Sequence, residues 1–279
     1  MGTTFLMTRL PALIVVPARH GSTRLPGKPL LRIAGRTLLE RVVAVAQTAA
    51  GLVQDCEVVV ATDDRRIADH AAAIGAEAVM TPASCDSGSS RAFMTALARQ
   101  ARPELVINLQ GDAPFVPPAV VAGLVHTLRE GCADVATPVY RLDWTRLDRL
   151  RAHKRTAPFS GTSCVRAADG RALWFSKTIL PAIRDEAELR AGGSLSPVWQ
   201  HLGLYGYRIA ALEWFAKAAQ GVYETIEGLE QLRFLEAGRT IATIEVQPPS
   251  HAMSGIDTPE DLILAEETIA RLGDPFVAR

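Results

Sequence analysis

The sequence predicts an α/β fold, in which helices cover both faces of a mostly parallel central sheet. Short runs of β-branched and other apolar residues alternate with segments of helical periodicity through the first half of the chain. The apolar runs contain no alternating polar positions, which is typical of strands that are buried on both faces of a parallel sheet. Together these two observations favour a Rossmann-like arrangement.

The elements of the first half follow the order strand, helix, strand, helix. We expect strands at residues 13–16, 57–61, 78–80 and 105–109, and helices at residues 37–50, 64–73 and 90–101. The first strand is expected to end at Pro17, and Thr37 is a suitable N-cap for the first helix. Because parallel strands need crossover connections, this alternation predicts a parallel sheet.

The second half of the chain is more mixed. We expect strands at 134–140, 200–207 and 241–246 and helices at 225–237 and 258–272. We also expect strands at 163–166 and 172–176, which flank an Ala-Asp-Gly turn signal, to form a hairpin. No linker is visible, so residues 10–279 are expected to form a single domain after a leader of residues 1–9. Residues 160–210 are expected to form a small hairpin lobe.

Charge and composition exclude several classes of function. The 279 residues contain 30 Lys and Arg against 30 Asp and Glu, so no net field attracts nucleic acid or anionic lipid. The apolar run near the N-terminus is far shorter than the ~20 residues of a membrane span. The four cysteines form no CxxC pair, which argues against zinc, and reduced thiols agree with a cytoplasmic location.

The loop at residues 17–29 directly follows the first strand and has the composition of a polyphosphate site. It holds three cations, Arg19, Arg24 and Lys28, together with two glycines that permit close backbone approach. It matches neither the P-loop pattern nor the GxGxxG fingerprint, which argues against a dinucleotide-dependent dehydrogenase. From composition alone, a solvated basic loop remains an alternative.

Two aspartates stand out at the ends of predicted elements. Asp112 follows the strand at 105–109, and Asp257 precedes the last helix. Taken singly, each is most simply a turn or cap residue. Taken together at the carboxyl edge of the sheet, they are suited to Mg²⁺, which prefers one or two carboxylates with phosphate oxygens and water.

The loop PAR-x-x-S-x-RLPGKPL resembles the signature of sugar nucleotidyltransferases, in the form seen in 3-deoxy-manno-octulosonate (KDO) cytidylyltransferases. Further matches follow in the same order: VVVATDDRRIADHAAAIGAEAVMT, INLQGDAPFVPP, DGRALWFSK, QHLGLYGYR, IEGLEQLRFLE and GIDTPEDL. The resemblance covers nearly all of residues 12–270. It implies a nucleotide-diphospho-sugar transferase fold and a homodimer formed through the hairpin lobe. It also implies Mg²⁺-dependent transfer of CMP from CTP to a small acidic sugar, for lipopolysaccharide biosynthesis.

The resemblance also assigns individual residues. The catalytic set is Arg24, Lys28, Asp112 and Asp257, of which Asp112 and Asp257 hold the metal. The nucleotide is assigned to Pro17, Ala18, Arg19, Ser22, Arg24, Lys28, Ser87, Gly88 and Arg91, of which Ser87, Gly88 and Arg91 read the base. The acceptor is assigned to Gln110, His201, Tyr205, Glu230 and Gln231. From the residues alone, an alternative for His201, Tyr205 and Tyr207, which share one strand face, is that they are core residues. The alternative for Glu230 is that it lies on a solvated helix face.

Several positions depart from the family pattern. Ala113 stands where these enzymes have Glu, the segment SGSSR at 87–91 lacks their acid, and residues 157–165 and 184–199 are atypical. The nucleotide half is therefore better preserved than the acceptor half. Another acid, such as a phosphonate or a modified KDO, remains an alternative acceptor, and a non-catalytic nucleotide-binding protein is a further alternative.

Overall fold

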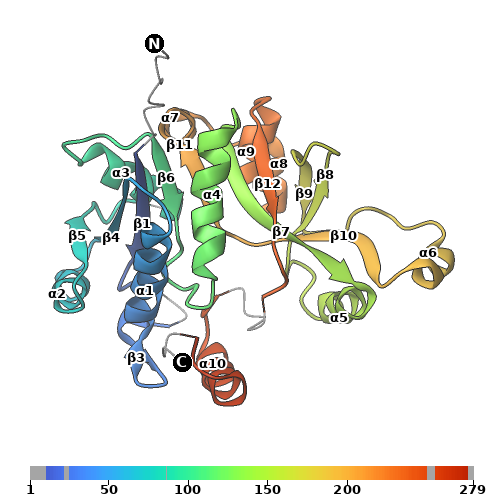
Figure 1. Ribbon diagram of the computed structural model, residues 1–279, viewed down its shortest axis with the longest axis horizontal. Coiled ribbons are helices and arrows are strands. Elements are labelled where there is room, and N and C mark those ends of the chain that lie inside the picture. The colour runs from blue at the N-terminus through green and yellow to red at the C-terminus, as the bar shows by residue number, and fades with distance from the viewer. Residues whose placement is uncertain (1–10, 22–24, 86, 250–254, 276–279) are drawn as a thin grey trace, which may run out of the picture.

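The computed structural model describes residues 11–21, 25–85, 87–249 and 255–275, and its centre is a ten-stranded mixed sheet (Figure 1). The strands are β1 (Ala12–Ala18), β4 (Cys56–Thr62), β5 (Glu77–Met80), β6 (Leu105–Asn108), β7 (Val135–Asp143), β8 (Ser163–Arg166), β9 (Ala172–Ser176), β10 (Leu195–His201), β11 (Tyr205–Arg208) and β12 (Ile241–Glu245). Their order is β5-β4-β1-β6-β11-β7-β10-β8-β9, and β12 also pairs with β7.

The first four strands of this order are parallel, as the alternation of elements predicted. β1 pairs in parallel with β4 and with β6, and β4 pairs in parallel with β5. The other half is antiparallel except for β12, which runs parallel to β7. The carboxyl ends of the parallel strands therefore meet at one edge, where sheets of this class bind ligands.

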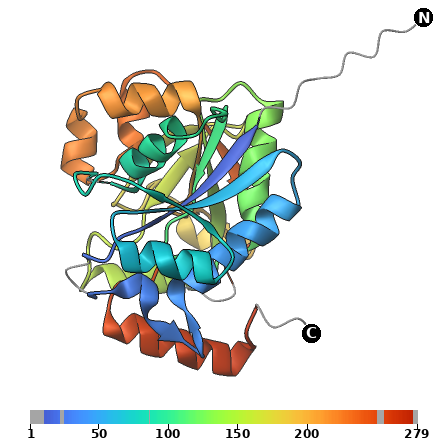
Figure 2. The ribbon, with the colours of Figure 1, turned by 90° about the vertical axis from the view of Figure 1, so that its left-hand side faces the viewer.

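Helices cover both faces of the sheet, as predicted (Figure 2). They are α1 (Leu38–Gly51), α2 (Arg65–Ala73), α3 (Gly88–Leu97), α4 (Pro118–Glu130), α5 (Trp144–Lys154), α6 (Glu186–Gly192), α7 (Ile209–Lys217), α8 (Val222–Glu227), α9 (Gln231–Glu236) and α10 (Pro259–Leu272). Ile14 and Val16 of β1 face the core with α1 and α4, whereas Leu13 and Val15 face the core with α3 and α7. This alternation explains why the strand has no polar position.

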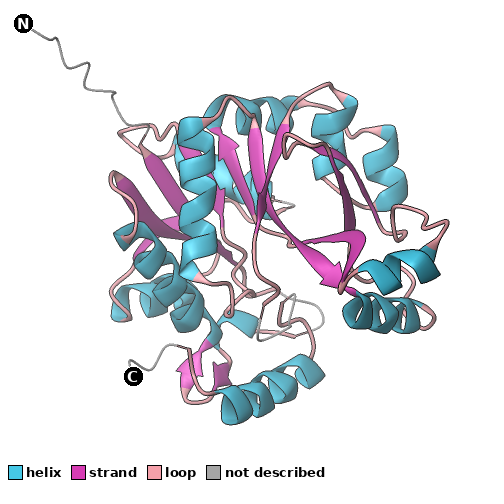
Figure 3. Ribbon diagram, turned by 45° about the vertical axis from the view of Figure 1, so that its right-hand side comes forward, coloured by secondary structure: helices cyan, strands magenta, loops and turns pink. Residues whose placement is uncertain are grey.

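A short 3₁₀ helix, η1 (Lys28–Leu30), and a ribbon of β2 (Arg32–Ile33) and β3 (Arg36–Thr37) connect β1 to α1. Figure 3 shows this ribbon and α10 together, outside the main sheet on the side of its carboxyl edge. Thr37 and Thr258 cap α1 and α10 with complete capping boxes, and Thr37 is the N-cap that the sequence predicted. The segment after β1 and the segment before α10 therefore lie at the same edge.

Two predicted elements are interrupted in the structure. The helix predicted at 225–237 is two helices, α8 and α9, because Gly228 adopts the left-handed conformation (φ 64°) and ends α8. The strand predicted at 200–207 is divided at Leu202–Leu204 into β10 and β11, although both run antiparallel to β7. The helix predicted at 90–101 begins earlier, at Gly88, and ends at Leu97.

Four helices, α4 to α7, have no counterpart among the predicted elements. The first of them begins at Pro118, and proline at the first helical position is a signal that identifies such a start. The hairpin of β8 and β9 forms as predicted and continues the main sheet through β10. Among the described residues, none of the helices combines the length and apolar character that crossing a bilayer requires.

Candidate active site

The loop after β1 turns back and delivers Lys28 to the carboxyl edge of the sheet. The Gly27 N–H donates to the His20 carbonyl (3.1 Å), and Gly27 has the left-handed conformation that glycine adopts without strain (φ 68°). Lys28 then begins η1, whose Pro29 is buried. Ser22 and Arg24 lie outside the described residues, so the structure does not locate these two predicted phosphate ligands.

Lys28 joins the two predicted metal aspartates. Its Nζ lies 2.7 Å from Oδ2 of Asp112 and 3.0 Å from Oδ1 of Asp257. The Lys28 side chain is 14% exposed, whereas the two carboxylates are 29% and 42% exposed and thus reach solvent in the cleft. Three residues from distant parts of the sequence therefore meet at one point of the cleft, with the Lys28 ammonium between the two carboxylates.

The backbone next to Asp112 explains how these segments approach each other. A Cβ on Gly111 would lie 2.3 Å from the carbonyl oxygen of Pro17, so only glycine lets the chain after β6 pass the end of β1. The Ile256 N–H donates to the Asp112 carbonyl at 2.9 Å and attaches the segment before α10. Asp261 then accepts hydrogen bonds from the N–H groups of Asp257 and Thr258.

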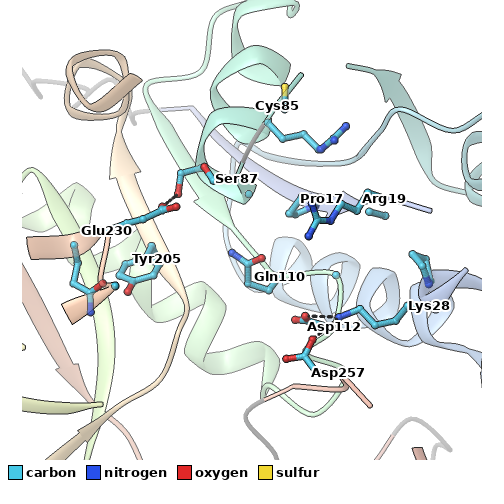
Figure 4. A pocket seen from close by; sticks show the side chains of 18 of the residues that line it. Pro17, Arg19, Lys28, Cys85, Ser87, Gln110, Asp112, Tyr205, Glu230 and Asp257 are labelled. Atoms are coloured by element: carbon cyan, nitrogen blue, oxygen red, sulfur yellow. Dashed lines mark hydrogen bonds and ion pairs between the residues drawn. The ribbon is translucent and has the colours of Figure 1, made fainter. Parts of the chain in front are cut away.

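A cavity of about 580 Å³ opens at this edge (Figure 4). Figure 4 shows Lys28, Asp112 and Asp257 on one side, Tyr205 and Glu230 on the other, and Gln110 between them. The predicted site residues that line it are Pro17, Ala18, Arg19, Lys28, Ser87, Gly88, Arg91, Gln110, Asp112, Tyr205, Glu230, Gln231 and Asp257. Apart from His201, the structure thus gathers every predicted site residue that it describes around one cavity.

The N-terminus of α3 forms part of the cavity wall. Ser87 is its N-cap, and the Ser90 hydroxyl closes the capping box by accepting from the Ser87 N–H (3.2 Å). In the family pattern an acid stands within this segment; here the serine hydroxyl supplies the reciprocal cap, so the helix start does not need the acid. The exposed N–H groups of such a helix start favour anions and polar ligand groups.

Arg91 lines the cavity from a buried position in which much of its guanidinium is already paired. It is 3% exposed, its Nη2 lies 3.0 Å from Oδ2 of Asp63, and its Nη1 donates to the Thr81 hydroxyl. Asp64, the neighbour of Asp63, is the N-cap of α2. A guanidinium held in this way is a rigid part of the cavity wall.

A second cavity, of about 440 Å³, adjoins the first. The two share Gln110, Tyr205, Leu229 and Gln231 as lining residues. The wall of the second cavity also includes His201, Tyr140, His153, Thr162 and Ala113. Because Gln110 and Tyr205 face both spaces, the site consists of two compartments that meet at these two side chains.

His201 lies in this second compartment as a neutral, hydrogen-bonded side chain. Burial, followed by the positive charge of Lys177, lowers the pKa of His201 to about 3. Its Nε2 lies 2.8 Å from the hydroxyl of Thr137. The rings of His201, Tyr205 and Tyr207 follow one another at centroid distances of 5.3 Å and 5.9 Å, so the predicted shared face exists despite the interruption between β10 and β11.

Glu230 and Gln231 stand at the start of α9 and not within a continuous helix. The break at Gly228 turns them toward the cavities, and Gln231 is only 3% exposed. Glu230 Oε2 accepts a hydrogen bond from the hydroxyl of Ser89 at 2.9 Å. The alternative of a solvated helix face is therefore wrong for this pair, because both side chains face the cavities.

Lys177, which the sequence-based set did not include, lies behind the wall of the second compartment and contacts Thr162, one of its lining residues. Its Nζ donates to Oγ1 of Thr162 at 3.1 Å, and burial lowers the pKa of this half-buried lysine. Glu227 nearby opposes that shift, and its carboxylate accepts from the Lys177 N–H. The signal was present in the segment DGRALWFSK, whose last residue is this lysine.

The donor set near Lys28 is chemically compatible with a divalent cation. Within the described residues no group of three or more His, Cys, Asp or Glu side chains converges, and Asp112 and Asp257 form a pair of carboxylates around Lys28. The Lys28 ammonium already occupies a point between these two carboxylates. A Mg²⁺ site of two carboxylates completed by phosphate oxygens and water has this composition.

Comparisons with known proteins agree with the fold. The family model described as cytidylyltransferase matches residues 13–241. The 3-deoxy-manno-octulosonate cytidylyltransferase of Maricaulis maris is 41% identical over 266 residues, which cover 95% of this chain and 99% of that protein. The enzyme of the same name from Chlamydia trachomatis serovar L2 is 37% identical over 91% of this chain and 92% of its own.

A solved structure of CMP:2-keto-3-deoxy-manno-octonic acid synthetase complexed with CTP superposes with a TM-score of 0.78. It is 33% identical to this chain, and the match covers 94% of this chain and 99% of the other. A 4-diphosphocytidyl-2C-methyl-D-erythritol synthase from Anaerococcus prevotii shares the fold at a TM-score of 0.57 and 15% identity. The chain therefore belongs to the cytidylyltransferase family, among its 3-deoxy-manno-octulosonate cytidylyltransferases.

Proposed function

We propose that this protein transfers CMP from CTP to 3-deoxy-manno-octulosonate and releases pyrophosphate, with Mg²⁺ as cofactor. The observation that carries the proposal is the convergence of Lys28, Asp112 and Asp257 at 2.7 Å and 3.0 Å, beside a second compartment suited to an acidic acceptor. The product is an activated sugar of the kind used in lipopolysaccharide biosynthesis.

The first compartment takes the nucleotide in this proposal. Lys28 and the exposed Arg19 supply positive charge for the triphosphate, and the unseen Arg24 belongs to the same loop. The N-terminus of α3, with Ser87 and Gly88, lies across the cavity and suits the polar edge of the base. The cavity volume of about 580 Å³ lies within the range of small-molecule sites.

Asp112 and Asp257 would hold the Mg²⁺. When bound, the metal neutralises charge on the phosphates and lowers the pKa of a coordinated hydroxyl. Lys28, which lies between the carboxylates in the structure, would then turn toward the β- and γ-phosphates. The two carboxylates keep this part of the cleft negative until cations and the triphosphate enter together.

The reaction is an in-line displacement at the α-phosphorus. A hydroxyl oxygen of the sugar forms the new P–O bond, the bond from the α-phosphorus to the bridging oxygen breaks, and pyrophosphate leaves with both electrons of that bond. The hydroxyl proton passes to solvent. Positioning of the two substrates and neutralisation of charge supply the catalysis, so no covalent enzyme intermediate is needed.

The second compartment takes the acceptor. Tyr205, Glu230 and Gln231 offer hydrogen bonds to sugar hydroxyls where the compartments meet. His201 lines the same space as a neutral side chain, and Lys177 stands behind Thr162 of its wall, where it can supply positive charge to an acceptor carboxylate. Gln110 faces both compartments and is suited to orient the attacking group.

The test is pyrophosphate release from purified protein with CTP, Mg²⁺ and a panel of acceptors. We expect turnover with 3-deoxy-manno-octulosonate and with CTP in preference to UTP. Formation of the CMP-sugar, followed by mass spectrometry, must match the pyrophosphate released. Tight CTP binding without turnover on any acid would instead identify a non-catalytic nucleotide-binding protein.

One observation favours a second acceptor class. Ala113 lines the acceptor compartment, where the family pattern has Glu, so a more strongly anionic acid meets less repulsion there. The panel therefore includes a phosphonate and a modified keto-acid sugar. Turnover with a phosphonate but not with 3-deoxy-manno-octulosonate would assign the second function in place of the first.

We also propose that the protein is a cytoplasmic homodimer. Segment 160–210 carries exposed Leu173, Leu189 and Leu195, which are suitable for burial against a second copy. The four cysteines, all among the described residues, form no disulfide, in keeping with a reducing compartment. Sedimentation equilibrium tests the dimer, and cell fractionation tests the location.

A further inference from the structure

Asn108, the last residue of β6, is a buried amide with unused hydrogen-bonding capacity next to the junction of the two compartments. It is 0% exposed, and neither its Nδ2 nor its Oδ1 has a hydrogen-bond partner among the described residues. An unpaired buried amide destabilises a folded protein, because its groups lose their hydrogen bonds to water and gain none in return. An apolar residue of similar shape would remove that cost, so the presence of Asn here calls for a functional reason.

The surroundings of Asn108 indicate which groups it serves. Its Nδ2 lies 3.2 Å from the point that a Cβ on Gly88 would occupy, and the Nε2 of Gln110 lies 3.0 Å from that same point. The two amides are therefore neighbours beneath the N-terminus of α3. Asn108 and Gln110 are two residues apart at the end of β6, an interval that directs side chains to the same face of a sheet.

Tyr205 completes these surroundings. It is paired directly with Asn108 between the antiparallel strands β6 and β11, so the two side chains stand side by side on one face. Gln110 and Tyr205 both line the two compartments, whereas Asn108 does not reach either surface. Asn108 therefore lies one layer behind the side chains that face the substrates.

We propose that Asn108 is a positioning residue for Gln110. When CTP and the acceptor fill the compartments, the Gln110 carboxamide turns onto the Asn108 amide. The hydrogen bond between them holds Gln110 in the orientation that aligns the acceptor hydroxyl with the α-phosphorus. This inference rests on the proposed function for the identity of the two substrates.

The test uses Asn108→Val and its matched partner Asn108→Thr, which have the same shape and differ in one hydroxyl. Both are suited to a strand. We expect Asn108→Val to keep its thermal midpoint within a few degrees of the wild type while kcat falls about tenfold or more. Asn108→Thr should recover a measurable part of that loss. Wild-type kcat in both variants, or equal losses in both folded variants, overturns the proposal.

A double-mutant cycle tests the route through Gln110. Gln110→Met alone should lower kcat, and Asn108→Val added to it should lower kcat no further, because the partner is already gone. Losses that multiply would show that Asn108 acts independently of Gln110 and would overturn the assignment. If Asn108→Val does not fold, Asn108→Thr takes its place in the same cycle.

Failure of this inference is distinguishable from failure of the proposed function. A wild-type protein that turns over no acid rejects the function, and CTP affinity by titration calorimetry then tests Asn108, because Gln110 lines the nucleotide cavity. We expect Asn108→Val to bind CTP at least about fivefold more weakly than Asn108→Thr. Equal CTP affinities of the two variants overturn the inference. If the wild type turns over and the Asn108 variants have the same kcat as the wild type, the inference fails and the proposed function stands.

Discussion

The ammonium group of Lys28 lies 2.7 Å from Oδ2 of Asp112, although 84 residues separate the two in the sequence. The same Nζ also reaches Asp257, 229 residues away, at 3.0 Å. A lysine that joins two partly exposed carboxylates holds together the β1 loop, the end of β6 and the segment before α10. At this point a divalent cation is expected to compete with the ammonium for the carboxylates, and a triphosphate is expected to compete with the carboxylates for the ammonium.

Removing one carboxylate should abolish most catalysis without unfolding the protein. We expect Asp112→Asn, which keeps the shape of the side chain, to lower kcat on the order of 10²–10³-fold at saturating Mg²⁺, as loss of a charged group at the reacting centre does. Pyrophosphate release measures the effect. Asp64→Asn is the matched control, because Asn is as good an N-cap as Asp and Asp64 is not among the cavity-lining residues. Near wild-type turnover of Asp112→Asn would contradict the proposed site.

Lys28→Met should increase the thermal stabilisation that Mg²⁺ gives the protein in the absence of nucleotide. The ammonium no longer neutralises Asp112 and Asp257, so the carboxylates repel each other and bind a divalent cation more readily. We expect a larger rise in the thermal midpoint with added MgCl₂ for Lys28→Met than for the wild type. The difference should disappear in the double variant with Asp112→Asn. An equal Mg²⁺ response in wild type and Lys28→Met would count against a metal at these carboxylates.

Gly111→Ala should damage both the fold and the activity. Its Cβ would lie 2.3 Å from the Pro17 carbonyl oxygen, so the backbone must shift and Asp112 moves with it. We expect a loss of roughly 1–3 kcal/mol in the free energy of unfolding, as in an overpacked core. Gly51→Ala is the control, because no atom lies within 4 Å of its added Cβ, and it should gain roughly 0.4–1 kcal/mol. Urea denaturation of both variants measures the difference.

His201 should make stability dependent on acid pH. Its pKa is lowered to about 3 in the folded protein by burial and by Lys177, against about 6.5 in the unfolded chain. Between these values the unfolded state binds more protons, so the free energy of unfolding falls by up to about 1.4 kcal/mol for each unit that the pH drops below 6.5. His201→Gln should lack this contribution. Parallel urea titrations from pH 8 to pH 4 that keep a constant difference between the two proteins would refute it.

Lys177→Met should weaken binding of the acceptor and leave binding of CTP unchanged. A charge-assisted hydrogen bond to a carboxylate contributes about 1.5–3 kcal/mol, so the acceptor KM should rise about tenfold or more. The affinity for CTP should not change, because Lys177 is not among the residues that line the nucleotide cavity. Lys217→Met is the control, since this lysine is 70% exposed on α7. Equal effects on CTP and acceptor would contradict a specific role in the acceptor compartment.

The sequence alone determined the parallel half of the sheet and the ends of α1 and α10. Strands such as β1 are continuous in sequence and uniformly apolar, and caps such as Thr37 and Thr258 act within three residues, so these features are local and visible in the chain. The family resemblance also predicted that Asp112 and Asp257 would share one site, and Asp112 follows a strand whose carboxyl end lies at the edge where sheets of this class bind ligands.

Only the tertiary structure decided how those residues meet. The bridging position of Lys28, the buried pairing of Arg91 with Asp63, the approach of Lys177 to Thr162 and the neighbouring amides of Asn108 and Gln110 each depend on contacts between separate elements. The break at Gly228, which turns Glu230 and Gln231 into the cavities, replaced a helix that local periodicity predicted. Local patterns specify elements, but side-chain pairs across elements follow from packing, which periodicity does not encode.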